Sequence, residues 1–464
     1  MRELTEAVTE RIIAFIQSLP EQPAADLTGG AELARSLVED LPETGTAARD
    51  LIDLIFDRAA PKGLNTAGPG YLAYIPGGGL FHAAVGDLVA NALNRFVGVW
   101  IAAPGLVQLE TNVIRWFNQM VGYPRTAGGV LTSGGSLANL TALVAARRQR
   151  LPEDFLTGTL YASDQVHHSV LKAAMLAGFP AANVRQIPTD QRRAIRLDEL
   201  ERQIAADRRS GVQPFFLVGS AGTTNTGAVD DLSALAALAE REGLWFHVDA
   251  AYGGFFLLTE RGQLRLAGIE RADSITLDPH KGLFLPYGTG CLLVRTLDTL
   301  RQAHSATADY MPGLQHSDEF IDYCTISPEL SRDFRGLRVW LPLKMHGAGA
   351  FRAALDEKLD LAEWAAGQLR LIEALEIVAE PQLSIVAFAL RPAGHAPDEA
   401  NSRTRELLDR INAKGRVHLT GTVLDGRFVI RICVLSFRTH KDRMEVCMED
   451  IRRSVREMTE AQRA

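Results

Sequence analysis

The chain has 464 residues, of which 47% are hydrophobic and 23% are charged, and its formal net charge is -7. This composition excludes a disordered chain and is typical of an enzyme with two or three domains around a large core. The acidic balance gives no basic surface for nucleic acid. No apolar run is long enough to cross a bilayer and the first residues lack a secretion signal, so we expect a cytoplasmic protein.

The chain opens with a segment of helical period, roughly residues 2–60, which prolines interrupt. Its apolar residues form one stripe along a helix, made of Leu4, Val8, Ile12, Phe15 and Ile16. Such a stripe packs on the core of its own chain more often than on a partner. A loop rich in Gly and Pro follows at residues 69–79, where the glycines permit close approach to a ligand or to another chain.

Residues 84–99 and 109–120 have the period of amphipathic helices. Trp100 follows the first of these helices and is able to wall an apolar pocket, although an aromatic residue at such a place is at least as often part of the core. Neither segment carries a catalytic signal of its own.

A turn of small residues at positions 128–136 precedes a helix that we predict over residues 137–149. The free backbone N-H groups and the dipole at the start of a helix attract an anion, and Ser136 adds a hydroxyl donor. The glycine spacing is neither that of a dinucleotide fingerprint nor that of a P-loop. Helix starts rich in Gly and Ser are common, so the turn alone is weak evidence for an anion site.

Strands then alternate with helices, and polar residues follow the ends of the strands. The strand at residues 160–163 is followed by His167 and His168, and the strand at residues 214–218 is followed by Thr224. An imidazole there is able to stack on a flat ring, but most histidines at such places are caps or surface groups, which is our interpretation of His168. The alternation predicts an α/β fold with a parallel sheet and ligands at its carboxyl edge.

Two later strands end in groups that are costly to bury alone. Residues 245–249 end in Asp249, which needs a partner if it is buried, although an Asp that only caps the next turn is the commoner case. Residues 273–277 lead to Lys281, in a chain where lysines are much rarer than arginines. A buried lysine can stay partly neutral and attack a carbonyl to form a Schiff base, whereas a lysine that merely reaches solvent is the plain alternative. Enzymes that use pyridoxal phosphate (PLP) pair such a lysine with an acid at the ring nitrogen.

The last third of the chain contains a strand at residues 288–295 and a long polar connection at residues 306–331, which holds Tyr310 and Tyr323. A helical run broken by Pro342 then leads to short strands and helices, which predict a smaller α+β domain. The role of one residue there stays open. Arg431 lies within an apolar strand, where it either meets a carboxylate across a cleft or, more commonly, exits to solvent.

The stretches His247–Tyr252 and Asp278–Lys281, which read HVDAAY and DPHK, closely resemble the group II PLP-dependent decarboxylases in their aromatic-L-amino-acid decarboxylase branch. The resemblance extends from about Pro69 to the C-terminus. It implies the α/β fold type I of PLP-dependent transferases, with a mostly parallel sheet covered by helices on both faces. We place an N-terminal helical segment at 1–70, the large PLP-binding domain at 71–345 and a small α+β domain at 346–464.

The resemblance also implies residue roles. It assigns the cofactor to Gly135, Ser136, His167, Thr224, Asp249, His280 and Lys281. Lys281 is expected to bind PLP covalently, Asp249 to face its ring nitrogen and His167 to stack on its ring. The spacing from Tyr323 to a following arginine resembles that after the proton-donating tyrosine of the family, so Tyr323 is expected to return a proton to the substrate α carbon.

The implied reaction converts an L-amino acid, expected to be aromatic, to an amine and carbon dioxide. The apolar wall of the substrate pocket is expected to include Tyr74, Phe81 and Trp100. Gly77 and Thr66 stand where the aromatic-amino-acid enzymes have a hydroxyl residue and a tryptophan, so the accepted side chain is open. The N-terminal segment of the family packs on a partner subunit, so we expect a homodimer with the active site at the interface.

Three alternatives remain at this point. A PLP-dependent aldehyde synthase, an aminotransferase or another lyase of the same fold type would keep the cofactor and change the outcome. A non-catalytic scaffold is disfavoured because Lys281 and Asp249 are both present.

Asp278 stands where the animal enzymes have asparagine, and we leave it out of the cofactor site because an acid near a phosphate is unfavourable unless it points away or pairs with an arginine. The four dispersed cysteines predict neither a metal site nor a disulfide framework.

Overall fold

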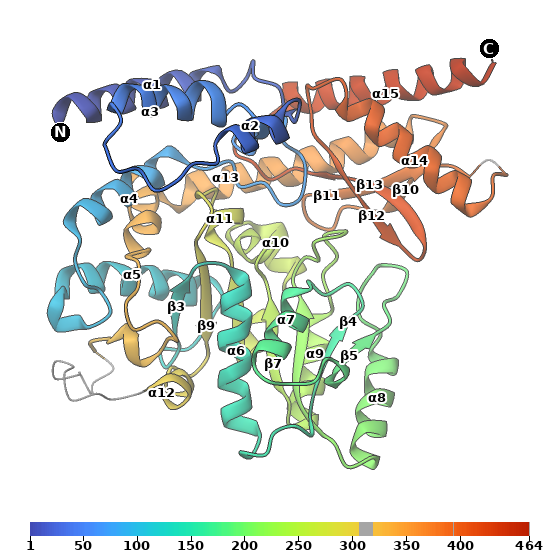
Figure 1. Ribbon diagram of the computed structural model, residues 1–464. Helices are drawn as coiled ribbons and strands as arrows, with labels where there is room; N and C mark the ends of the chain where they lie inside the picture. Colours follow the sequence, from blue (N-terminus) through green and yellow to red (C-terminus); the bar gives the residue numbers. More distant parts are fainter. Residues whose placement is uncertain (306–318, 393, 464) are drawn as a thin grey trace. The chain divides into compact units, whose positions relative to one another are not determined.

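The computed structural model describes residues 1–305, 319–392 and 394–463, with side chains described as far as residue 461 (Figure 1). The chain divides into two compact units. The large unit is Gly79–Asp360 with Ala379–Ile385, and the small unit is Met1–Gly78 with Leu361–Val378 and Val386–Ala464.

The large unit is built on a seven-stranded sheet in the order β3-β9-β8-β7-β6-β4-β5. The strands are β3 (Gly128–Thr132), β4 (Gly158–Ser163), β5 (Val184–Ile187), β6 (Gln213–Ser220), β7 (Trp245–Asp249), β8 (Ser274–Leu277) and β9 (Gly290–Val294). The pairs from β8 to β5 are parallel, whereas β9 runs antiparallel to both β8 and β3. Most of these strands are buried along their whole length, as expected for a parallel sheet covered on both faces.

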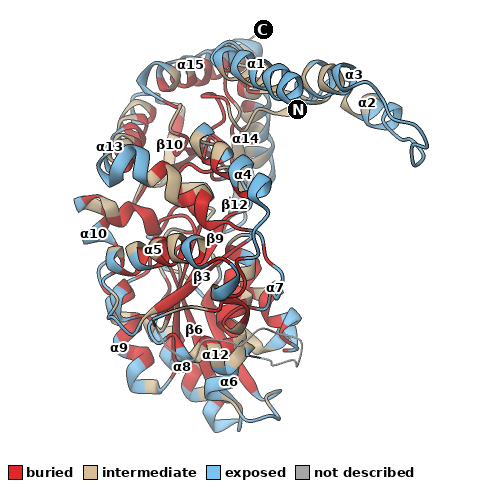
Figure 2. Cartoon of the chain, turned by 90° about the vertical axis from the view of Figure 1, so that its left-hand side faces the viewer, coloured by how far each residue is buried: buried red, intermediate tan, exposed pale blue. Residues whose placement is uncertain are grey.

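The helices of the large unit connect the strands and cover the sheet. They are α4 (Phe81–Leu93), α5 (Pro104–Met120), α6 (Gly135–Arg150), α7 (Ser169–Leu176), α8 (Leu197–Arg209), α9 (Leu232–Glu242), α10 (Glu260–Arg265), α11 (Pro279–Gly282) and α12 (Asp298–His304). α13 (Gly336–Arg370) continues past the unit boundary at Asp360. In Figure 2 the strands are buried while the helices expose their outer faces.

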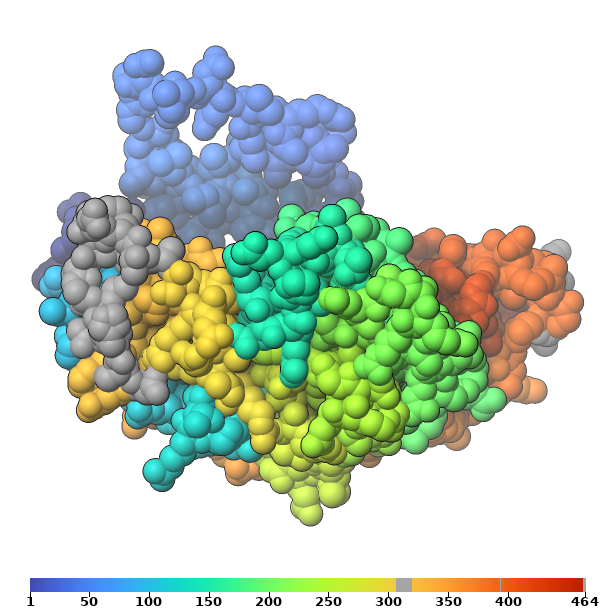
Figure 3. Space-filling model, turned by 90° about the horizontal axis from the view of Figure 1, so that it is seen from below, coloured from blue at the N-terminus to red at the C-terminus, as the bar shows by residue number. Residues whose placement is uncertain are grey.

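Strand β6 shows that both faces of the sheet are covered. Phe216 and Val218 belong to a buried cluster with residues of α6, whereas a side chain at Gly219 would meet Leu232 and Leu235 of α9. Successive residues of a strand point to opposite faces, so α6 and α9 lie on opposite sides of the sheet. The predicted α/β fold is therefore confirmed. Figure 3 views the large unit from below, where the teal and green surface belongs to its helices and the turns between them.

The small unit has its own sheet and its own core. Its four-stranded sheet has the order β10-β11-β13-β12, with β10 (Leu375–Ala379), β11 (Ile385–Leu390), β12 (Thr420–Leu424) and β13 (Arg427–Cys433). Its helices are α1 (Arg2–Ser18), α2 (Gly30–Ser36), α3 (Ala48–Asp53), α14 (Pro397–Asn412) and α15 (Lys441–Arg463), and β1 (Ala25–Asp26) pairs with β2 (Gly63–Leu64). The apolar faces of α14 and α15 pack on the sheet around Leu407, Ile430 and Met448.

Several local predictions need correction. The predicted helix at 84–99 ends at Leu93, because Asn94 adopts a left-handed conformation with φ 46°. The break in the long helix falls at Gly347, with φ 72° and ψ 156°, and not at Pro342. Arg431 does not exit to solvent: it is buried and donates to Thr420 Oγ1 at 3.0 Å and to the carbonyl oxygen of Tyr74 at 3.2 Å.

The apolar stripe of α1 does not reach the core of the chain. None of the residues of α1 is buried, and Leu4 is 50% exposed. The other four residues of the stripe are half-buried, so the stripe packs on the rest of the chain only in part. Within the described residues, no helix is long and apolar enough to cross a membrane.

Candidate active site

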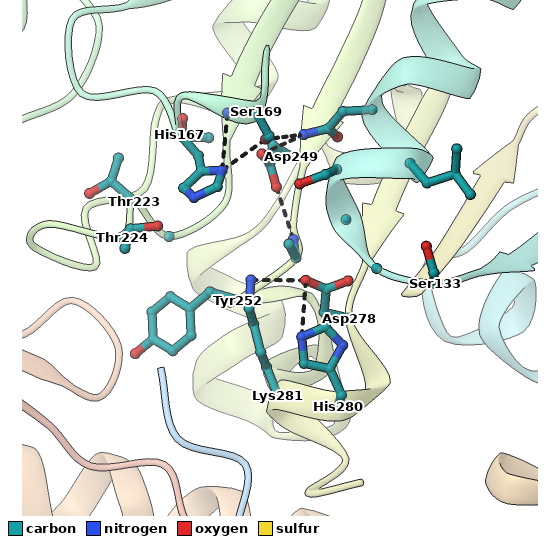
Figure 4. A pocket seen from close by; sticks show the side chains of 18 residues that line it. Ser133, His167, Ser169, Thr223, Thr224, Asp249, Tyr252, Asp278, His280 and Lys281 are labelled. Carbon is teal, nitrogen blue, oxygen red and sulfur yellow. Dashed lines mark hydrogen bonds and ion pairs between the residues drawn. The ribbon is translucent and has the colours of Figure 1, made fainter. Parts of the chain in front are cut away.

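The carboxyl edge of the large sheet holds a cavity of about 280 Å³ (Figure 4). β7 and β8 lie side by side and parallel, with Asp249 opposite Thr276, so residues that follow the two strands reach the same place. All seven residues predicted to contact the cofactor line this cavity: Gly135, Ser136, His167, Thr224, Asp249, His280 and Lys281. They come from five separate connections of the α/β pattern, as a shared site at this edge requires.

Lys281 enters the cavity from the short helix α11. Pro279 occupies the first turn of this helix, where a missing N-H costs nothing, and the chain turns abruptly after β8. The Lys281 ammonium nitrogen Nζ lies 2.9 Å from Asp278 Oδ2 (Figure 4). Its neighbour His280 is held through Nδ1, 2.6 Å from the carbonyl oxygen of Thr289, and burial lowers the pKa of this imidazole.

Asp278 was left out of the predicted site, but it lines the cavity and neither points away nor pairs with an arginine. Its side chain is 3% exposed, and its oxygen Oδ2 faces both Lys281 Nζ and, at 3.7 Å, His280 Nε2. Its second oxygen, Oδ1, is buried without a hydrogen-bond partner. The sequence argument failed because it did not foresee that the lysine three residues later would supply the positive charge.

Asp249 ends β7 and presents its carboxylate to the cavity (Figure 4). Its Oδ1 accepts the backbone N-H of Ala251 at 3.1 Å, and its Oδ2 accepts the side-chain N-H of Asn139 at 3.1 Å. Hydrogen bonds from N-H groups stabilise the ionised form of a carboxylate. An acid oriented in this way is able to face the nitrogen of a cofactor ring.

Asn139 lies at the centre of a buried polar network behind Asp249. Its amide oxygen accepts from Thr276 Oγ1 at 2.6 Å and lies 3.0 Å from His247 Nε2, while its amide nitrogen also donates to Ser169 Oγ at 3.0 Å. Burial lowers the pKa of His247 to about 4, so this imidazole is neutral at pH 7. All of the donor and acceptor positions of the Asn139 amide are thereby used, which fixes its orientation.

His167 receives its orientation from the same network. Its Nδ1 lies 2.8 Å from Ser169 Oγ and accepts the backbone N-H of Ser169 at 3.3 Å (Figure 4). Burial lowers the pKa of His167, which favours the neutral ring. Because Nδ1 is an acceptor, the proton of the neutral ring lies on Nε2. His168, by contrast, is exposed, in agreement with its interpretation as a surface group.

The start of α6 forms a close backbone cradle for an anion. A Cβ atom at Gly135 would come within 3.0 Å of Asp278 Oδ2 and 3.3 Å of the Ala251 side chain, so a larger residue there would require these neighbours to shift. Ser136 follows at the second position of the helix, whose dipole favours a negative charge. A phosphate cradle, an acid for the ring nitrogen, a flat imidazole and an amine for the aldehyde therefore surround one cavity, and these residues fit PLP.

The structure does not bring the remaining predicted residues to the cavity. Tyr323 is 1% exposed within an apolar cluster, its hydroxyl lies 3.3 Å from Thr111 Oγ1, and it is not among the residues that line the cavity. Trp100 stacks on Phe320 with ring centres 4.2 Å apart. Phe81 begins α4 and is 37% exposed, and Tyr74 belongs to the small unit. Tyr310 lies outside the described residues.

Sequence reasoning missed Asn139, Ser169 and Tyr252, which also line the cavity. Asn139 follows Ser136 by three residues on the same helix, so the helical period could have placed both on one face. Tyr252 belongs to the HVDAAY stretch, and its hydroxyl lies 2.7 Å from Ser384 Oγ. Within the described part of the chain, no group of three or more potential metal ligands is found.

Comparison with known proteins agrees with this site. The conserved domain of pyridoxal-dependent decarboxylases matches residues 32–391. An aromatic-L-amino-acid decarboxylase from Bacillus atrophaeus is 36% identical over 461 residues, which cover 99% of this chain and 96% of that protein. A phenylacetaldehyde synthase from Arabidopsis thaliana is 27% identical over 447 residues, which cover 94% of this chain and 91% of that protein. Oryza sativa TDC, solved with PLP and tryptamine, superimposes with a TM-score of 0.94 at 28% identity over 98% of both chains.

These similarities confirm the predicted family, fold, cofactor and reaction class. The match covers most of the chain, and it includes both stretches on which the resemblance rested. The chain belongs to the pyridoxal-dependent decarboxylases, in the aromatic-L-amino-acid decarboxylase branch of group II, and is a PLP-dependent amino acid decarboxylase.

Proposed function

We propose that the cavity at the carboxyl edge of the large sheet converts aromatic L-amino acids to amines and carbon dioxide. The observation that carries the proposal is the convergence of Lys281, Asp249 and the start of α6 on one cavity of about 280 Å³. The aromatic preference is supported by the Bacillus atrophaeus relative, whose name states that class of substrate.

In this proposal the chain holds PLP at four places. Gly135 and Ser136 would hold the phosphate at the start of α6, Asp249 would face the ring nitrogen, His167 would stack on the ring, and Thr224 and His280 would border the site. Lys281 would supply the amine that reacts with the aldehyde. When bound, PLP supplies a ring that accepts the electron pair left behind by the departing carboxylate.

The orientation of the Asp249 side chain is central to the proposed chemistry. A carboxylate beside the ring nitrogen keeps that nitrogen protonated, and a protonated ring is the better electron acceptor. Asn139 and the Ala251 backbone hold the carboxylate in place through their N-H groups at 3.1 Å. Because His247 is neutral, its Nε2-H can donate to the Asn139 oxygen and leave both amide hydrogens for Ser169 and Asp249.

His167 presents its Nε2 proton away from Ser169. This N-H is a hydrogen-bond donor suited to the carboxylate of an incoming amino acid, because Nδ1 is already occupied by Ser169. The neutral ring can hold the substrate carboxylate without the strong attraction that would oppose its departure as carbon dioxide.

The proton that replaces carbon dioxide on the α carbon needs a donor of its own. Tyr323 is the residue that the family resemblance proposes. Burial and the nearby Glu110 raise the pKa of its hydroxyl, so the phenol stays protonated and able to donate. Its position in the apolar cluster is a reason to test it directly against Tyr310.

We also propose a homodimer with the active site at its interface. Support comes from the half-exposed apolar stripe of α1 and from exposed apolar residues of α4 such as Leu88 and Leu93. In this arrangement residues 1–70 pack on the partner, and Tyr74, Phe81 and Trp100 contribute to an apolar substrate pocket. The proposed division into parts at 71–345 and 346–464 follows the family pattern.

The cytoplasmic location is likewise a proposal. Its support is that all four cysteines are free thiols and buried. Free thiols are the rule in a reducing compartment.

The substrate assignment is tested by supplying PLP-loaded enzyme with L-tyrosine, L-tryptophan, L-dihydroxyphenylalanine, L-glutamate and L-leucine. Carbon dioxide, amine, aldehyde and oxygen uptake are measured together, with K281A as the matched inactive control. The proposal expects equal amounts of carbon dioxide and amine from aromatic substrates and no oxygen uptake. Aldehyde with oxygen uptake would assign an aldehyde synthase instead, the activity named for the Arabidopsis thaliana relative.

A further inference from the structure

A buried carboxylate lies next to the expected phosphate position. The side chain of Asp278 is 3% exposed, and its Oδ2 lies 3.0 Å from the position that a Cβ atom on Gly135 would occupy, at the first residue of α6. Oδ2 has Lys281 Nζ at 2.9 Å, whereas Oδ1 is buried and has no hydrogen-bond partner. Among the described residues, the cavity thus contains a buried acceptor oxygen that is available to a donor group of a ligand.

This carboxylate changes the electrostatics of phosphate binding. A phosphate monoester carries nearly two negative charges above pH 7, because its second pKa is about 6. A second, partly unpaired negative charge in the same buried cradle is strongly unfavourable. One proton placed between a phosphate oxygen and a carboxylate oxygen removes one charge and gives Oδ1 the donor that it lacks.

The titratable groups around Asp278 leave its Oδ1 available to this proton. The titratable groups that face Asp278 from the elements packed around it are Lys281 and His280 of α11, Asp249 of β7, His167 before α7 and Cys291 of β9. Burial lowers the pKa of His280 and of His167, which favours the neutral form of both rings, and Lys281 contacts Oδ2 rather than Oδ1.

We propose that Asp278 binds the phosphate of PLP through a shared proton, so that phosphate binding takes up one proton from solvent. This inference rests on the proposed assignment of the phosphate to the start of α6. One O-H···O hydrogen bond forms between Asp278 and the phosphate, and no covalent bond of the protein changes. An asparagine at this position would donate a neutral N-H to a dianionic phosphate instead, without proton uptake.

The test compares two ligands and two proteins. PLP and pyridoxal, which lacks the phosphate, are titrated into cofactor-free wild type and D278N between pH 7 and 8.5. Calorimetry in buffers of different ionisation enthalpy gives the number of protons taken up. Any proton change at Lys281 is common to both ligands, so the difference between PLP and pyridoxal isolates the contribution of the phosphate.

The expected result is that PLP takes up about one more proton than pyridoxal in the wild type and none more in D278N. The wild-type affinity for PLP should then fall by about tenfold more per pH unit than the affinity of D278N, by linkage. Equal proton uptake in the two proteins would overturn the inference. Wild type that binds no PLP at all would overturn the proposed cofactor site itself, so the two failures are distinguishable.

A second measurement needs only the wild type and guards against a D278N variant that folds poorly. The phosphorus-31 resonance of a phosphate monoester reports its ionisation. Bound PLP should keep the chemical shift of the monoanion through pH 8. A dianion shift at pH 8 would contradict the shared proton.

Discussion

Asn139 Nδ2 lies 3.1 Å from Asp249 Oδ2 and 3.0 Å from Ser169 Oγ, so one buried amide holds both the acid and, through Ser169, His167. Asp249 is expected to face the ring nitrogen of the cofactor and His167 to stack on its ring. The network thereby fixes these two side chains relative to each other. The hydrogen bonds of this network run from neutral His247 to the Asn139 oxygen, and from the Asn139 nitrogen to Asp249 and Ser169 at the cavity.

Replacing Asn139 by alanine should therefore weaken function without unfolding the protein. Loss of a hydrogen bond to a charged group costs about 1.5–3 kcal/mol, so kcat/KM should fall on the order of ten- to hundredfold. The visible spectrum of bound PLP should also change its pH dependence, because Asp249 loses a donor. T141A is the matched control, since Thr141 is buried on the same helix and its hydroxyl donates to the carbonyl oxygen of Leu137 in the same helix. Unchanged kcat/KM and spectrum in N139A would remove Asn139 from the positioning network.

The neutral state of His247 predicts a pH dependence of stability. The folded pKa is about 4, whereas an exposed histidine has a pKa near 6.5, so the unfolded chain binds more protons between these values. The free energy of unfolding should fall as the pH drops from about 6.5 to about 4, by at most about 3 kcal/mol. Urea unfolding at a series of pH values tests this. H247N should show a shallower slope in this window, and equal slopes in the two proteins would exclude His247 as the titrating group.

A fully buried ion pair provides a separate test of packing. Arg332 Nη1 lies 2.6 Å from Glu110 Oε1, and both side chains are 0% exposed. E110Q leaves the guanidinium without its counter-charge, which should lower the free energy of unfolding by about 3–5 kcal/mol. The exposed pair of Glu199 and Arg202 is the matched control, and E199Q should change stability by at most about 1 kcal/mol. Thermal and urea unfolding measure both, and equal small effects would contradict the buried pair.

The two tyrosines of the 306–331 connection can be separated by experiment. Y323F removes a hydroxyl that contacts Thr111, and Y310F is the matched control because Tyr310 belongs to the same connection. The variant that lacks the proton donor should still bind PLP and substrate. It should release amine slowly and accumulate side products, because a phenol is needed to return the proton to the α carbon. If Y323F is as active as wild type while Y310F loses amine formation, the predicted role of Tyr323 is wrong.

The cofactor side of the site was predictable from the sequence because its residues follow strands. Asp249 and Lys281 come after adjacent buried strands, and Gly135 and Ser136 start a helix, so the α/β pattern alone brings them to one edge. The family resemblance then supplied their roles. The predicted strands and helices of the large unit followed from the same alternation, but the helix predicted at 84–99 ends at Leu93 and the break in the long helix falls at Gly347.

Contacts between distant side chains were less predictable. The link from Asn139 to His247 joins residues that are 108 positions apart, and neither residue type announces it. Asp278 was left out of the predicted site because an acid near a phosphate is unfavourable. It lines the cavity, where Lys281 lies 2.9 Å from its Oδ2, and the sequence argument did not consider this contact. Tyr323 was selected by spacing, and spacing carries no information on whether a side chain packs inward.

The central claim is that Lys281 is the residue that binds PLP. Purified enzyme with PLP is treated with borohydride, which fixes a bond between the cofactor and a lysine, and is then digested and analysed by mass spectrometry. The account predicts the added pyridoxyl mass on the peptide that contains Lys281, and its disappearance in K281R. The same mass on another lysine, or a K281R enzyme that keeps the label and full activity, would contradict the account.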